Sequence, residues 1–145
     1  MTLPLARFRA LPRRERRFLI EAALCLLAVR LVLAVLPFRD ALRLIGAVPG
    51  EASAGRQVAA EPGEIRRAIE RAARHVPFRA VCLQQAFAAL LMLRRRGLAA
   101  TVHFGLAQGA EGRPLVAHAW SCCGPIAVTG GDTAAKFVAV ANFAA

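Results

Sequence analysis

A cysteine and a histidine are the residues of this sequence whose types and spacing best suit chemistry. Cys82 opens a helical stretch, and His118 follows 36 residues later in Ala117-His118-Ala119-Trp120. A helix N-terminus favours thiolate over thiol, and a nearby imidazole can take the thiol proton. If the two side chains meet, the chain has the parts of a cysteine hydrolase or acyl-transfer enzyme. Each residue alone also has an ordinary structural interpretation, as a small apolar residue and as a packed ring.

Two predicted helices position the cysteine. The apolar spacing indicates one helix from Glu61 to just before Pro77, and a second over residues 81–96 that Gly97 caps. Cys82 falls in the first turn of the second helix. The backbone amides at that helix start are natural donors to an oxyanion.

Beyond Gly97 the sequence pattern changes from helical to alternating. Short apolar runs separated by glycine and proline predict an antiparallel sheet, and helices followed by such a sheet indicate the α+β class. The predicted strands are residues 100–106, 115–122, 126–129 and 138–143, with a helical turn over 132–137 before the last.

The first 50 residues form a helical, basic and apolar segment. The run from Phe18 to Leu36 is long enough to span a bilayer. Glu21 and Arg30 interrupt it, and each charge costs roughly 2.5–3.5 kcal/mol near a membrane centre. We therefore expect a buried or partner-binding helix, with contact to a membrane surface as the alternative. The predicted division is a helical segment over 1–50, a linker over 51–60 and a domain over 61–145.

The composition indicates one domain with an attraction to anions. The chain has 145 residues and a net charge of +11. This charge suits an acidic peptide, nucleic acid or a membrane surface. Nucleic acid is the least favoured of the three, because the basic residues are dispersed and no recognisable binding motif is present.

The sequence predicts no metal and no cofactor. The four cysteines include no CxxC pair and form no disulfide framework, which fits a reducing cytoplasm. His75 and His103 have no metal-ligand spacing around them. No phosphate-binding loop is present, so any ATP requirement would belong to a partner.

Several motifs together resemble the lasso-peptide leader peptidases, which are transglutaminase-like cysteine proteases. The resemblance covers about residues 60–143, and the helical N-terminus with Leu36-Pro37-Phe38 is similar to the family's lead-in. It implies a transglutaminase- or papain-like core, in which the cysteine-bearing helix packs on a small antiparallel sheet. The motifs are Cys82-Leu83 before an apolar helix, Leu93-Arg-Arg-Arg-Gly97-Leu98, Ala117-His118-Ala119-Trp120 and Val128-Thr-Gly-Gly131.

The resemblance implies removal of the leader from a ribosomally made lasso precursor peptide. Cys82 would attack the scissile carbonyl, and His118 would act first as base and then as acid. An asparagine-synthetase-like cyclase would then close the macrolactam. Because the first 50 residues show no alternating strands, a separate leader-recognition protein is expected. Gln84 and Gln85 are possible catalytic helpers, although glutamines at this position are more often exposed.

The third catalytic residue has two interpretations. The family usually carries an aspartate about a dozen residues after the histidine, and Asp132 is the only acid after His118. Asp132 also follows two glycines, where aspartate is a good helix N-cap. If it is a cap, a backbone carbonyl or the Thr129 hydroxyl would orient His118.

Two other function classes stay open. One is a catalytically inactive transglutaminase-like protein that binds peptide. The other is a membrane-associated adaptor whose N-terminal helix is the functional part.

Overall fold

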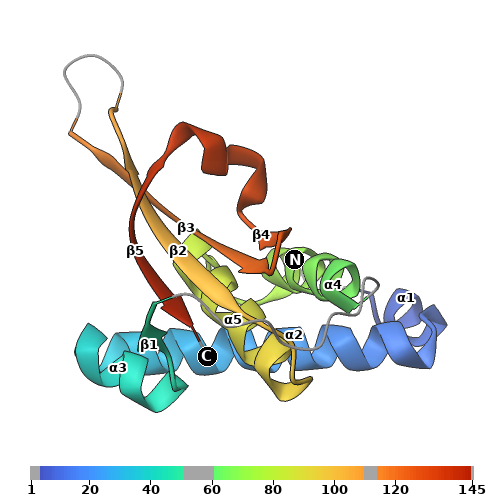
Figure 1. Ribbon diagram of the computed structural model, residues 1–145. Helices are drawn as coiled ribbons and strands as arrows, with labels where there is room; N and C mark the ends of the chain where they lie inside the picture. The colour runs from blue at the N-terminus through green and yellow to red at the C-terminus, as the bar shows by residue number, and fades with distance from the viewer. Residues whose placement is uncertain (1–3, 51–60, 110–113, 145) are drawn as a thin grey trace.

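The α-helices come first along the chain, up to Arg95, and four of the five described strands follow from Thr101 onward, as the sequence predicts (Figure 1). The computed structural model describes residues 4–50, 61–109 and 114–144, except for the side chain of Thr133. The helices are α1 (Leu5–Ala10), α2 (Arg13–Val35), α3 (Phe38–Ile45), α4 (Glu61–His75), α5 (Cys82–Arg95) and the 3-10 helix η1 (Gly131–Lys136).

In the described part of the chain, five strands form one antiparallel sheet in the order β1-β5-β2-β3-β4. The central strand β2 pairs Gly105 with His118 of β3 on one side, and His103 with Asn142 of β5 on the other. The α+β class is confirmed. The strands are β1 (Val48–Pro49), β2 (Thr101–Ala107), β3 (Val116–Cys123), β4 (Ile126–Thr129) and β5 (Val138–Ala144).

Helix α5 is the centre of the core, between the sheet on one side and α2 and α4 on the other. Its apolar residues are buried nearly all round, and Phe87 contacts the ring of Phe104 on β2 at 6.1 Å. The helix ends where Gly97 takes the left-handed conformation, with φ of 68°. This placement fixes Cys82, the first residue of α5, relative to the sheet.

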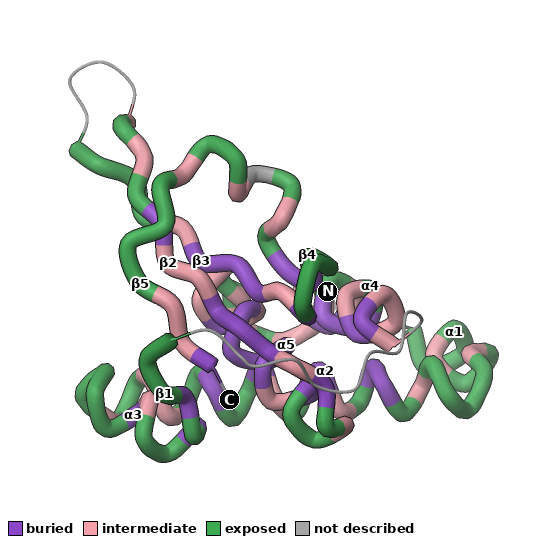
Figure 2. The backbone as a smooth tube through the Cα atoms, in the orientation of Figure 1, coloured by how far each residue is buried: buried purple, intermediate pink, exposed green. Residues whose placement is uncertain are grey.

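Helix α2 contributes one of its faces to this same core. Ala22, Leu26 and Val29 are almost fully buried, and the burial map shows purple segments alternating with green along the helix (Figure 2). The side chain of Glu21 joins α2 to the end of α5 through Arg96, at 2.6 Å, and Arg95, at 3.1 Å. The predicted linker over 51–60 lies outside the described residues, and the boundary at residue 61 stays a prediction.

Two short elements were not predicted from the sequence. Helix α1 is short and has no buried residue, and β1 is a two-residue strand that contains Pro49. A strand this short carries no alternation, so only its pairing with Phe143 and Ala144 of β5 identifies it.

Candidate active site

Two glutamines hold the segment that leads into Cys82. The Gln84 side-chain oxygen accepts the Val81 amide at 3.3 Å, and the Gln85 side chain donates to the Ala80 carbonyl at 2.8 Å. The first bond satisfies one of the amides that a helix N-terminus leaves without a partner. Gln84 is buried rather than exposed, so the pair positions the half-buried Cys82 at the start of α5.

The ring of His118 lies in a row of rings on one face of the sheet. It stacks on Trp120 at a centroid distance of 5.9 Å and contacts Phe137 at 4.9 Å. His103 of β2 stacks on the same tryptophan at 5.5 Å. Gly105 faces this row, where a Cβ would lie 2.6 Å from Trp120. These contacts fix the plane of the imidazole.

A backbone carbonyl determines which ring nitrogen of His118 carries the proton. Its Nε2 lies 3.0 Å from the Gly130 carbonyl oxygen. A carbonyl oxygen only accepts, so Nε2 carries the proton and Nδ1 is the basic nitrogen of the neutral ring. The sequence left a backbone carbonyl and the Thr129 hydroxyl as alternatives to Asp132 for orienting His118. In the structure the carbonyl makes this contact. The Thr129 hydroxyl instead pairs with the Ser121 hydroxyl at 2.7 Å, inside the core.

Asp132 lies at the start of η1 with its carboxylate against Arg66 of α4. The two distances to the guanidinium are 3.1 and 3.2 Å, and 80% of the Asp132 side chain is exposed. Arg66 also holds Glu70 at 3.0 Å. The structure therefore brings Asp132 together with Arg66, and a catalytic role for Asp132 stays a prediction.

Alternate side chains of β3 point to opposite faces of the sheet. Ala119 is buried toward α5, where its register partner Phe104 contacts Phe87. His118 and Trp120 lie on the other face. Cys82 lies on α5, which packs against the core-facing side of β3. The two predicted partners are thus on contacting elements, but among the described residues no hydrogen bond joins thiol and imidazole.

Comparison with known protein families identifies the architecture. A family model of the transglutaminase-like superfamily matches residues 23–142, which is most of the chain. The chain belongs to the transglutaminase-like superfamily. No curated protein and no solved structure matches it. The transglutaminase-like core predicted from the sequence is confirmed, and the match includes most of α2 as well as the domain that follows.

Gly130 of this transglutaminase-like chain is constrained by both conformation and space. Its φ is +67°, and a Cβ would lie 2.9 Å from both the His118 Nε2 and the Ala119 carbonyl oxygen. A side chain at this position would displace the ring from its present place.

Replacing Gly130 with alanine is therefore expected to lower the free energy of unfolding by about 2–4 kcal/mol, from backbone strain and crowding together. Gly97→Ala is the matched control, because Gly97 has φ of +68° and open space around its Cβ position. That variant should lose only about 1–2 kcal/mol in urea unfolding. Equal losses in the two variants would contradict crowding at His118.

The other thiols of this transglutaminase-like chain are poor nucleophiles. Burial, followed by the nearby Glu21 carboxylate, raises the pKa of Cys25 to about 11. Burial also raises the pKa of Cys122 and of Cys123. A raised thiol pKa keeps the unreactive protonated form up to higher pH.

At pH 8 we therefore expect iodoacetamide to label Cys82 first and Cys25 last by at least tenfold in rate. Labelling of Cys25 should increase only as the pH approaches 11. Peptide mass spectrometry after timed quenching measures the four rates. Faster labelling of Cys25 than of Cys82 in the folded chain would contradict this order.

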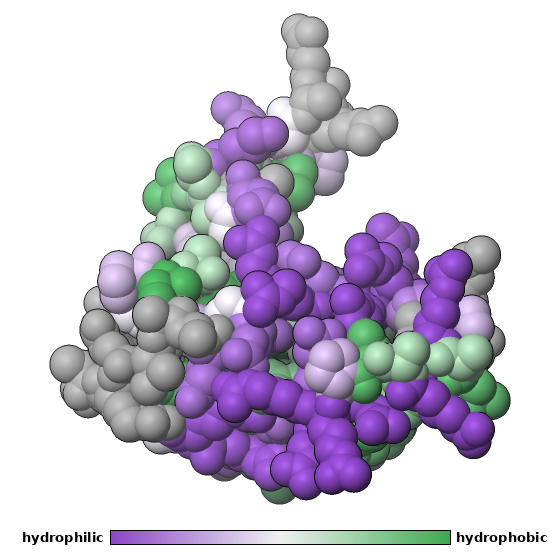
Figure 3. Space-filling view, turned by 90° about the vertical axis from the view of Figure 1, so that its right-hand side faces the viewer, coloured by the Kyte–Doolittle hydropathy of each residue, from purple (hydrophilic) through white to green (hydrophobic). Residues whose placement is uncertain are grey.

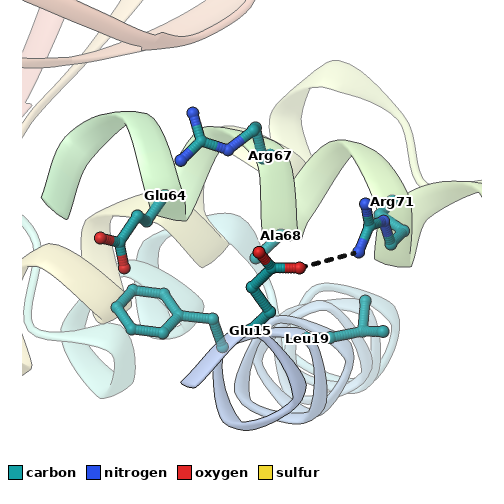
Figure 4. Close-up of a pocket in the computed structure, with 7 residues that line it drawn as sticks. Glu15, Leu19, Glu64, Arg67, Ala68 and Arg71 are labelled. Carbon is teal, nitrogen blue, oxygen red and sulfur yellow. Dashed lines mark ion pairs between the residues drawn. The ribbon is translucent and has the colours of Figure 1, made fainter. Parts of the chain in front are cut away.

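A separate pocket of about 120 Å³ lies between α2 and α4 (Figure 4). Glu15 of α2 points toward Arg71 of α4, with an ion pair at 3.8 Å. None of its described lining residues carries a thiol or an imidazole, so we assign it to packing of the two helices. Its lining residues are Glu15, Phe18, Leu19, Glu64, Arg67, Ala68 and Arg71. In the described part of the chain, no group of three or more His, Cys, Asp or Glu residues is arranged to hold a metal ion.

Proposed function

We propose that this chain is a cysteine peptidase that removes the leader from a ribosomally made lasso precursor peptide. The observation that carries the proposal is the setting of Cys82 and His118. Cys82 begins the buried central helix, and His118 lies on the strand against which that helix packs, with its tautomer fixed by Gly130. Membership of the transglutaminase-like superfamily supports cysteine-based acyl chemistry.

In the proposed reaction, the Cys82 sulfur attacks the carbonyl carbon of the scissile peptide bond. The thiol proton passes to Nδ1 of His118, and from there to the leaving amine as the C–N bond breaks. Water then hydrolyses the thioester and restores the thiol. Amides at the start of α5 would stabilise the oxyanion, since a helix N-terminus presents donors and a positive dipole end.

The partners follow from the resemblance. A separate leader-recognition protein would deliver the precursor, and an asparagine-synthetase-like cyclase would use the freed amino terminus to close the macrolactam. The mechanism requires the imidazole to reach the thiol in the complex with peptide. Catalytic hydrogen bonds of enzymes commonly tighten only when substrate is bound.

The orientation of His118 favours a second candidate, a transglutaminase-like protein that binds the precursor without cutting it. The ring lies on the sheet face opposite the buried Ala119, and the Asp132 carboxylate is paired with Arg66. In this candidate the cysteine has no chemical role.

A reconstituted mixture distinguishes the two candidates. The full chain is incubated with a synthetic precursor, taken from a short neighbouring reading frame, and with the leader-recognition protein. Mass spectrometry should detect separate leader and core fragments. Intact precursor that nevertheless binds the chain would reject the peptidase and support the binding protein.

A further inference from the structure

Helix α2 carries a stripe of aliphatic side chains that the fold leaves uncovered. We name it the α2 stripe. Its five residues recur at intervals of four, three, four and four, which places them on one face of the helix. They are Ile20, Leu24, Leu27, Leu31 and Val35, with 46, 61, 43, 55 and 76% of their surface exposed.

The opposite face of α2 is also apolar, and it is buried in the core. A helix that lies on a soluble protein normally has a polar outer face, so the α2 stripe has no explanation in the packing of this chain. By length and composition α2 is able to cross a membrane. Only 28% of its most apolar stretch of 18 residues is buried within the fold. The stripe is therefore a candidate contact with an apolar environment outside the fold.

A groove between α2 and α5 adjoins the stripe and extends its apolar surface. It has a volume of about 530 Å³, and its lining combines aliphatic side chains with three charged ones: Arg17, Ile20, Glu21, Leu24, Cys25, Ala28, Leu91 and Arg95. The stripe and groove together form one apolar surface. The stripe alone runs over 15 residue steps, roughly 22 Å at the rise of an α-helix.

Basic side chains lie on the same face of α2 as the stripe, nearer the N-terminus of the helix. Arg13 and Arg17 precede Ile20 and Leu24 by seven residues each, which is two helical turns, and both arginines are exposed. The nearby acids are engaged elsewhere, because Glu15 pairs with α4 and Glu21 with the end of α5. Hydrophilic atoms dominate the view from the end that carries α1 and the start of α2 (Figure 3). The net charge of +11 on the chain adds a general attraction to anions.

We propose that the α2 stripe docks on an anionic lipid surface, with α2 lying in the plane of the membrane. An aliphatic helix face beside arginines is the pattern of interfacial helices, in which apolar side chains enter the acyl boundary and arginines contact headgroups. A protein partner would more typically select aromatic residues, and the stripe contains none. A span is disfavoured because its other face holds the core and because Glu21 is ion-paired to α5. This docking does not depend on peptidase activity.

Flotation of the full chain with lipid vesicles tests the proposal. The two vesicle types are phosphatidylcholine containing phosphatidylglycerol, and phosphatidylcholine alone. The chain should float with the anionic vesicles only, and raised salt should release it, because headgroup attraction is screened. Absence of flotation with anionic vesicles would overturn the proposal.

Two variants and one control assign the binding to α2. Leu24→Ser with Leu31→Ser should weaken vesicle binding at least tenfold, because both side chains lose their apolar surface. Arg13→Gln with Arg17→Gln should weaken it roughly thirtyfold, at about 1 kcal/mol per arginine. Val138→Ser with Val140→Ser is the matched control, since these aliphatic residues of β5 are 73 and 60% exposed, and it should float unchanged.

Three further outcomes would overturn the proposal. Unchanged flotation of the Leu24 and Leu31 variant would show that the stripe is not the contact. If the wild-type chain is a dimer in light scattering, binds no vesicles, and becomes a monomer in this variant, the stripe is the contact with a second copy of the chain. Resistance of the bound chain to alkaline carbonate extraction would show that α2 spans the bilayer.

Discussion

Replacing Cys82 with alanine is expected to lower the rate of precursor cleavage by roughly 10⁴-fold or more, because the covalent route is lost. Alanine preserves the first turn of α5, since it is a good helix former and the two glutamine contacts of that turn do not involve the thiol. The measurement is a single-turnover assay with the reconstituted mixture, read by mass spectrometry.

Cys122→Ala is the matched control for this variant. Its thiol is also half-buried and lies on β3, four residues beyond His118, yet no chemistry is assigned to it. Its cleavage rate should stay within about twofold of the wild type, as for a neutral substitution. Leader cleavage by the Cys82→Ala chain at the wild-type rate would reject the peptidase mechanism.

Replacing Phe87 with alanine is expected to lower the free energy of unfolding by about 3–5 kcal/mol, the range for removal of a buried aromatic ring. Phe87 is fully buried at the centre of α5, and its ring contacts Phe104 of the sheet. Such a loss is a large part of the about 5–15 kcal/mol that stabilises an ordinary domain. Urea unfolding of the full chain measures it.

Phe38→Ala serves as the control for ring removal. Phe38 contacts the same Phe104 ring at 6.0 Å, but 44% of it is exposed, so less apolar surface returns to water when it is removed. We expect a loss of about 1–2 kcal/mol. A smaller loss for Phe87→Ala than for Phe38→Ala would contradict the central position of α5 in the core.

Local sequence patterns were sufficient to predict most of the elements around the site. The first turn of α5, the Gly97 cap and the strand that carries His118 all agree with the structure. Each depends on neighbours within a few residues, through helix spacing, a left-handed glycine and strand alternation.

The pairings across the fold were not predictable in the same way. Asp132 contacts Arg66, which is 66 residues away, and Glu21 contacts Arg96, 75 residues away. One sequence does not show which of many arginines an acid will meet, because the choice depends on how α4 and α5 pack. The acceptor that orients His118 is the main-chain oxygen of Gly130, which no residue type in the sequence reveals. The sequence therefore offered a backbone carbonyl only as an alternative to Asp132.

The carbonyl that orients His118 belongs to the main chain, so mutation acts on it differently than on a side-chain partner. A catalytic aspartate is lost by a single codon change, whereas every amino acid at position 130 brings a carbonyl oxygen with it. Substitution there can move the acceptor, through the Cβ contacts of Gly130, but cannot remove it. The carbonyl also does not titrate, so the hydrogen bond at Nε2 stays available at acid pH, where a carboxylate would be protonated. A point mutation at position 130 therefore leaves a carbonyl acceptor in the chain, although any side chain there would crowd the His118 ring.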